Sequence, residues 1–127
     1  MQHTTATQVL RRDAAAVREL RSWLVAELGA RTPLDAERID DTALMVSELA
    51  TNVLVHTASD GAVTITTADD SVRVEVADQG AGLPVLRDVD PTRVGGNGLR
   101  IVDSWSTEWG VDRHADGGKV VWLCVRY

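Results

Sequence analysis

Hydrophobic residues recur every three or four positions between residues 12 and 28. This spacing places them along one side of an α-helix, and most of the arginines in the stretch lie off that side. The apolar positions are Ala16, Leu20, Trp23, Leu24 and Leu28. Asp13 has the chemistry of an N-cap for this helix, and we expect Gly29 to end it.

A second and longer helix is predicted from about residue 35 to about residue 56, with Asp35 at its N-terminal turn. Its apolar face consists of Ile39, Ala43, Val46, Ala50, Val53 and Thr57, with Leu49 and Leu54 at the sides. The side nearly opposite carries Asp41, Met45, Glu48, Asn52 and His56. On an ordinary surface helix, that side would be a solvated stripe.

Two strand-like runs follow, at residues 62–67 and 72–77. Alternation in the second run puts Val72, Val74 and Val76 on one face of a strand. Because only a few residues connect the runs, they are predicted to form an antiparallel hairpin.

Two further strands are predicted near residues 107–113 and 119–126, joined by an Asp-Gly-Gly turn. Residues 1–10 form either a short edge strand or a frayed terminus. The aromatic residues that we expect to pack on a sheet face are Trp109, Trp122 and Tyr127.

The composition is that of one soluble globular domain, because the 127 residues are 44% hydrophobic and 25% charged. We place the domain at residues 8–127, with residues 1–7 as a flexible N-terminus or the start of an edge strand. The net charge of −6 argues against nucleic acid and against an anionic membrane, since both are bound mainly through Lys and Arg. There is neither a run of roughly 18 apolar residues nor a signal-peptide pattern, so the expected location is the cytoplasm.

Cysteine and histidine chemistry indicates no site. Cys124 stands in an apolar run, and we expect it to be a small buried hydrophobe. The three histidines are scattered and no cysteines cluster, which excludes a zinc-type ligand set. No serine lies in a G-x-S-x-G context, and no Ser-His-Asp set is evident.

Candidate chemistry begins on the second helix, where Glu48, Asn52 and His56 follow one another at intervals of four residues. Side chains spaced by four lie on one face of a helix. A solvated face usually mixes both signs of charge, yet no Lys or Arg occurs between residues 39 and 72. This row therefore favours holding a metal ion and polarising a water over a solvated surface.

Two glycine-bearing segments follow. Asp78 comes at the end of a predicted strand, and Gly80 and Gly82 after it would let a ligand approach the backbone closely. Further along, Gly96 and Gly98 open a short predicted helix, and helix N-termini bind phosphate. Each segment alone is also compatible with an ordinary turn. Neither is a Walker-type P-loop or a complete dinucleotide fingerprint.

In this order and at these separations, the motifs E-L-A-T-N-V-L-V-H, D-Q-G-A-G-L and G-G-N-G-L-R-I-V-D resemble those of the GHKL (Bergerat-fold) ATPase superfamily, which includes DNA gyrase, histidine kinases and mismatch-repair ATPases. Within it, the chain looks most like the stand-alone anti-sigma factor serine/threonine kinases. The resemblance covers about residues 8–126. It implies an α+β fold: a two-layer α/β sandwich whose mostly antiparallel mixed sheet has about three helices on one face.

The resemblance also implies roles for the helix row and the strand end, in binding ATP and Mg²⁺. Glu48 matches the general base that acts on the attacking hydroxyl or water. Asn52 matches the Mg²⁺ ligand, and His56 matches a histidine near the nucleotide. Asp78 matches the carboxylate that accepts the adenine amino group.

The glycine segments are assigned by the same resemblance. Gly80 and Gly82, with Leu83, match the floor beneath adenine and the hinge of a lid. The loop and helix start over the phosphates correspond to Gly96, Asn97, Gly98 and Leu99. One position departs from the family pattern, because Val120 stands where a threonine usually helps to bind adenine. We expect this change to remove one hydrogen bond, which contributes about 0.5–1.5 kcal/mol.

The implied function is that of an ATP-dependent kinase that binds a sigma factor and phosphorylates a STAS-type anti-anti-sigma protein, and the resemblance suggests a homodimer. One alternative is a non-catalytic nucleotide-binding module that sequesters a regulatory protein by partner switching, and Val120 favours it. Another is a plain ATPase. A detached sensor-kinase domain is disfavoured, since no phosphoacceptor histidine helix precedes the motifs.

Overall fold

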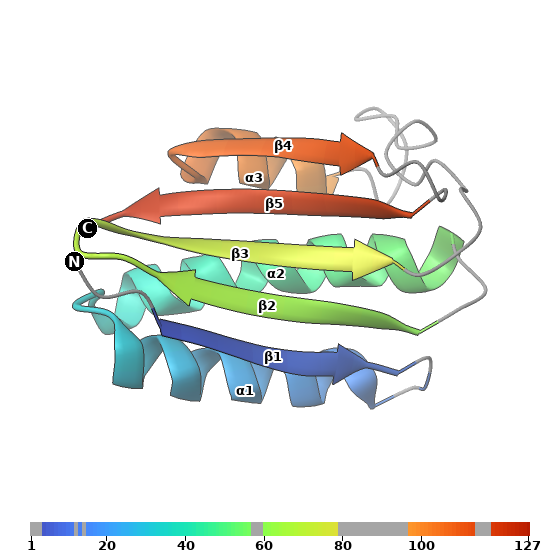
Figure 1. Ribbon diagram of the computed structural model, residues 1–127, viewed down its shortest axis with the longest axis horizontal. Coiled ribbons are helices and arrows are strands. Elements are labelled where there is room, and N and C mark those ends of the chain that lie inside the picture. The colour runs from blue at the N-terminus through green and yellow to red at the C-terminus, as the bar shows by residue number, and fades with distance from the viewer. Residues whose placement is uncertain (1–3, 12, 14, 57–59, 79–96, 114–117) are drawn as a thin grey trace.

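The computed structural model describes residues 4–11, 13, 15–56, 60–78, 97–113 and 118–127. They form two layers, a five-stranded sheet and three helices that cover one of its faces. Figure 1 looks onto the other face, with all three helices behind the strands. The predicted α+β two-layer architecture is confirmed.

The sheet has the strand order β1-β2-β3-β5-β4, which puts the N-terminal strand at one edge. Its strands are β1 (Thr4–Leu10), β2 (Gly61–Thr67), β3 (Ser71–Asp78), β4 (Glu108–Arg113) and β5 (Lys119–Arg126). Every pairing between these described strands is antiparallel, including the predicted β2–β3 hairpin. The sheet is therefore antiparallel rather than mixed in the described part of the chain.

The helices are α1 (Ala16–Arg31), α2 (Ala36–His56) and α3 (Asn97–Trp105). In Figure 1, α1 lies behind β1, α2 crosses behind β2 and β3, and α3 lies behind β4 and β5. The predicted apolar stripes face the sheet: in α1, Leu20, Leu24 and Leu28 are at most 1% exposed. On the sheet side, the three alternating valines of β3 are completely buried, as predicted.

The predicted ends of α1 were wrong at both termini. Asp13 is not the N-cap, which is Ala15; the Asp13 carboxylate instead accepts a hydrogen bond from the Ala15 N–H at 3.0 Å. At the other end, the helix continues through Gly29 to Arg31. A Cβ placed on Gly29 would meet nothing within 4 Å, so nothing there demands a glycine.

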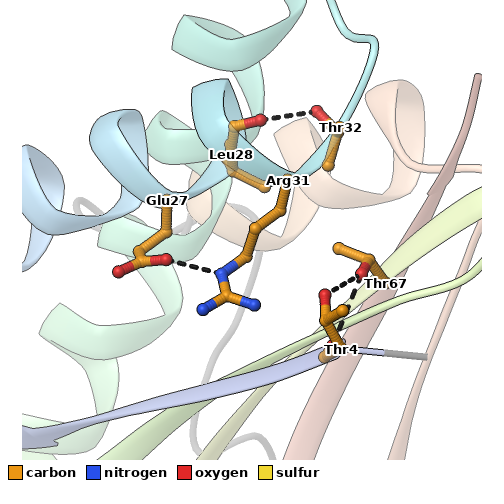
Figure 2. Close-up of polar contacts among 6 residues, drawn as sticks. All are labelled: Thr4, Glu27, Leu28, Arg31, Thr32 and Thr67. Carbon is orange, nitrogen blue, oxygen red and sulfur yellow. Dashed lines mark hydrogen bonds and ion pairs between the residues drawn. The ribbon is translucent and has the colours of Figure 1, made fainter. Parts of the chain in front are cut away.

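Side chains stabilise the last turn of α1 and the neighbouring sheet edge (Figure 2). The Leu28 carbonyl accepts two hydrogen bonds from Thr32, one from its N–H at 3.0 Å and one from its hydroxyl at 2.7 Å. The Arg31 guanidinium pairs with Glu27 at 2.6 Å, one turn earlier. Beside them, the Thr4 and Thr67 hydroxyls are hydrogen-bonded and join β1 to β2.

The start of α2 agrees with the prediction. The Asp35 carboxylate accepts a hydrogen bond from the Arg38 N–H at 2.9 Å, the arrangement of an N-capping aspartate. Because the cap fixes the first turn, it also fixes which residues of the helix point to the sheet. Ile39, Val46 and Val53 are buried on that side.

One β5 residue, Cys124, is less buried than predicted. Val121, Leu123 and Val125 face the helices, so alternation places Trp122 and Cys124 on the uncovered face, where both are half-buried. There, the Arg73 guanidinium lies 4.3 Å from the centre of the Trp122 ring. Partial burial raises the pKa of the Cys124 thiol, which keeps it protonated. Trp109 and Tyr127 do pack against the core.

Replacing Leu24 by alanine is expected to lower the free energy of unfolding by about 2–5 kcal/mol, because the side chain is fully buried between α1 and the sheet. Chemical denaturation would measure the loss. Val25→Ala is the matched control: its side chain is 38% exposed, and a change within about 0.5 kcal/mol is expected. Equal losses in the two variants would contradict the orientation of α1.

Candidate functional site

One end of the sheet collects the polar residues that the sequence singled out. Gly61, Asp78 and Lys119 are register partners across β2, β3 and β5, at the first position of β2, the last of β3 and the first of β5. Asp78 alternates with the buried valines of β3, and Lys119 alternates with Val121 of β5. Both side chains therefore point toward the helix layer, where the apolar core ends.

Asp78 and Lys119 form a buried ion pair. The Lys119 ammonium lies 3.8 Å from a carboxylate oxygen of Asp78, and each side chain is only 2% exposed. Lys119 is the only lysine in the sequence. Sequence reasoning missed it, because a lysine after two glycines resembles a solvated turn residue and because both alternating sets of the following strand are apolar.

The structure corrects the interpretation of Val120. Val120 pairs with Ala77, so its side chain lies on the uncovered face of the sheet, opposite to that of Asp78. The position beside Asp78 on the same face is Lys119. Loss of a hydroxyl at Val120 thus removes no contact next to Asp78, and the charged Lys119 is the residue to consider there.

Strand β3 and helix α2 both lie close to Gly61 at this end of the sheet. A Cβ on Gly61 would lie 2.6 Å from the Ala77 carbonyl oxygen and 3.6 Å from a methyl carbon of Val53. The α2 turn that contains Asn52 and Val53 therefore lies against the strand position paired with Asp78. Any larger residue at Gly61 would push the backbone of β3 away.

Asn52 is buried in this turn, with 9% of its surface exposed. Its Nδ2 atom is buried and has no hydrogen-bond partner among the described residues. An unsatisfied buried amide destabilises a protein, so its presence calls for a reason beyond packing. The two ends of an amide are interchangeable in such an assignment, so either the nitrogen or the oxygen could face a ligand here.

The polar stripe of α2 is not a solvated surface. Met45 is 1% exposed, Asn52 is buried, and Asp41 and Glu48 are half-buried. The reason is that α2 packs against both α1 and α3 as well as against the sheet. Glu48 lies one turn before Asn52 on this partly covered side.

Helix α3 begins at the same end of the molecule (Figure 1). β5 starts at this end and β4 is antiparallel to it, so β4 starts at the far end, directly after α3 finishes. The first residues of α3, Asn97 and Gly98, therefore lie toward Asp78 and the end of α2. Helix N-termini favour anions, which suits a phosphate-bearing ligand.

The remaining predicted site residues cannot be placed in the same way. Gly80, Gly82, Leu83 and Gly96 lie outside the described residues. His56 is the last residue of α2, and Leu99 lies in the first turn of α3; the structure describes the backbone but not the side chain of each.

A magnesium ion bound with a nucleotide fits the residues that are present. The described parts of the chain hold no group of three or more His, Cys, Asp or Glu side chains that could bind a metal. Mg²⁺ usually keeps several waters and takes few protein ligands beside substrate phosphates. One buried amide with a free end, at Asn52, meets that need.

The chain belongs to the histidine kinase-like ATPase family, whose domain model matches residues 10–125. No curated protein sequence matches it. Among solved structures it is similar to the RsbU and RsbW domains of Rv1364c from Mycobacterium tuberculosis, with a TM-score of 0.69 and 22% identity over 97% of this chain. It is also similar to the histidine kinase domain of the blue-light activated histidine kinase from Erythrobacter litoralis, with a TM-score of 0.58 and 26% identity over 87% of this chain.

The chain spans 32% of the first of these structures and 59% of the second. The predicted GHKL fold is thus confirmed, and with it an ATP-binding domain of the kinase-like type. Among the helices that the structure describes, none is long and apolar enough to cross a membrane.

Replacing Asn52 by leucine, a residue of similar size, is expected to leave the free energy of unfolding unchanged or raise it by about 1 kcal/mol. The change removes an unsatisfied amide and improves helix propensity. Denaturation of the nucleotide-free protein would measure this. Thr51→Leu, at an exposed neighbouring position, controls for helix propensity; it also removes the hydrogen bond from the Thr51 hydroxyl to the Ser47 carbonyl. A loss of more than about 1 kcal/mol relative to that control would mean that the Asn52 amide is paired in the apo protein.

Proposed function

We propose that the chain binds ATP with Mg²⁺ at this end of the sheet and acts as a serine/threonine protein kinase of the anti-sigma factor type. The family match supports nucleotide binding in general. The observation that carries the proposal is the convergence of two buried polar side chains at one end of the core, Asn52 from α2 and Asp78 from β3.

Asp78 would recognise the base. A carboxylate only accepts hydrogen bonds when ionised, and the adenine amino group only donates, so the two are complementary. The site is dry, which strengthens such a bond, because water does not compete for the buried carboxylate. Gly80, Gly82 and Leu83 would form the floor beneath the base.

Asn52 and Glu48 would act at the phosphates. The Asn52 amide oxygen would hold Mg²⁺, which supplies charge neutralisation on the transferring phosphate. Glu48, half-buried one turn earlier, would accept the proton of the attacking hydroxyl. Phosphoryl transfer is mainly positioning and electrostatics, so these two residues with a helix N-terminus form a sufficient set.

The rest of the phosphate site would come from the end of α2 and the start of α3. His56 would lie near the nucleotide. The loop and first turn over the phosphates would be formed by Gly96, Asn97, Gly98 and Leu99.

The proposed partners are a sigma factor and a STAS-type anti-anti-sigma protein whose serine or threonine receives the phosphate. One of the similar structures is described as containing RsbU and RsbW domains, which supports a role in partner switching. The chain's net charge of −6 supports protein partners over nucleic acid and membranes. We further propose a cytoplasmic location, a catalytic unit spanning residues 8–127, and a homodimeric assembly.

The non-catalytic alternative has lost its specific support, since Val120 faces away from Asp78. The two functions differ in one observable. Only the kinase transfers labelled phosphate from ATP to a STAS-type protein, and a plain ATPase would release phosphate steadily without an acceptor.

Glu48→Gln is expected to reduce phosphotransfer at least about 100-fold while ATP affinity changes less than about three-fold, because the amide keeps the size of the carboxylate but cannot accept a proton. Single-turnover transfer from labelled ATP to a STAS-type acceptor would measure the first effect, and calorimetry the second.

Glu37→Gln is the matched control, an exposed carboxylate in the first turn of the same helix. It should leave both quantities unchanged. Transfer by Glu48→Gln at the wild-type rate would remove Glu48 as the base. No transfer by the wild-type protein, with ATP bound, would favour the non-catalytic module.

A further inference from the structure

The buried pair at the end of the sheet offers a nucleobase a hydrogen-bond donor, Lys119, as well as a carboxylate acceptor, Asp78. Lys119 stands beside Asp78 on the neighbouring strand, faces the same layer and is equally buried. The pair therefore presents a hydrogen-bond acceptor and a hydrogen-bond donor side by side, with 3.8 Å between the charged atoms. At that distance the contact is an ion pair rather than a short hydrogen bond.

The ammonium group has capacity for another partner. It carries three N–H donors, so it can remain beside Asp78 and still donate to a ligand atom. Its charge in a dry site makes such a bond stronger than one from a neutral hydroxyl. The side chain belongs to the first residue of β5, at the rim of the core rather than in its middle.

Adenine has the matching pattern. Its exocyclic amino group donates, and the ring nitrogens on either side of that group, N1 and N7, accept. A base whose amino group binds Asp78 thus brings a ring nitrogen to the neighbouring position on the same side.

We propose that Lys119 is a second base-recognition residue, which donates a hydrogen bond to a ring nitrogen of adenine while Asp78 accepts from the amino group. This inference rests on the proposed nucleotide function and adds to it the residue that reads the ring. It also gives the chain's only lysine a task that a hydrophobic residue at the end of the core could not perform.

Deaza analogues test the contact in the unaltered protein. In 1-deaza-ATP a carbon replaces the ring nitrogen N1, and in 7-deaza-ATP a carbon replaces N7. Both analogues retain the amino group and the triphosphate of ATP. Calorimetry with Mg²⁺ is expected to show that one of the two analogues binds about ten-fold or more weakly than ATP, as for loss of a charge-assisted hydrogen bond. Equal binding of all three nucleotides would overturn the proposal.

The lysine itself supplies a second readout that does not depend on activity. In protein labelled with ¹⁵N at the lysine side chain, Lys119 gives the sole ammonium resonance, since no other lysine is present. That resonance is expected to shift on addition of ATP, and to shift less with the analogue that binds weakly. An unchanged resonance at saturating ATP would contradict the contact.

Lys119→Met removes the donor and keeps most of the side-chain volume. It is expected to bind ATP about ten-fold more weakly and to bind ATP and the weak analogue equally well. Arg113→Met is the matched control, because Arg113 is the exposed register partner of Lys119 on β4. It should keep the wild-type preference between nucleotides.

Each outcome has a separate meaning. Tighter ATP binding by Lys119→Met would show that Lys119 competes with the base, and would overturn the proposal. If Lys119→Met does not fold, the analogue series on wild-type protein still decides. Absence of ATP binding by the wild-type protein would refute the proposed function together with this inference, whereas equal binding of ATP and both analogues refutes the inference alone.

Discussion

A buried ion pair closes one end of a mainly apolar core, and the proposed site is built around it. Removing two charges from water is expensive, and their mutual attraction offsets that only when the pair is held in good geometry. Here the geometry comes from the sheet, because Asp78 and Lys119 are register partners on adjacent antiparallel strands. Breaking such a pair by removing one partner usually destabilises a protein by about 3–5 kcal/mol. A pair that replaces ordinary core packing at a strand end is best explained by a ligand that uses it.

The same end of the sheet depends on a residue without a side chain. Gly61 lets β3 pass close to β2, because a Cβ there would lie 2.6 Å from the Ala77 carbonyl oxygen, and Val53, next to Asn52 in α2, packs against the same position. The helix is covered on several sides, so Asn52 is buried and Glu48 is half-buried. Preorganised polar groups in a dry setting are the means by which proteins bind charged transition states. The position of α2 against the sheet thus serves both the packing of the core and the proposed site.

Much of this arrangement could be predicted from the sequence. Periodicity located the helices and the hairpin, and the capping chemistry of Asp35 located the start of α2. The spacing of Glu48, Asn52 and Asp78 along the motifs predicted a site region, and the structure places the buried Asn52 and Asp78 at the same end of the sheet. The predicted end of α1 was wrong, because a solvent-facing glycine does not stop a helix whose last turn is stabilised by Thr32 and by the Glu27–Arg31 pair.

The sheet faces on which Lys119 and Trp122 lie were harder to predict, because both depend on which residue begins β5. A shift of one residue exchanges the two faces of a strand, so the burial of every side chain in it is decided by the pairing with β3. That pairing joins segments about 40 to 55 positions apart, and periodicity within one segment carries no information on it. Only the folded sheet shows that Lys119, and not Val120, stands beside Asp78.

The most direct test of the central claim is a crystal structure of the protein with Mg²⁺ and a non-hydrolysable ATP analogue. The account predicts the adenine amino group within hydrogen-bond distance of the Asp78 carboxylate, and the metal bound by the Asn52 amide oxygen and phosphate oxygens. A nucleotide bound elsewhere, or an Asn52 side chain remote from the metal, would contradict it.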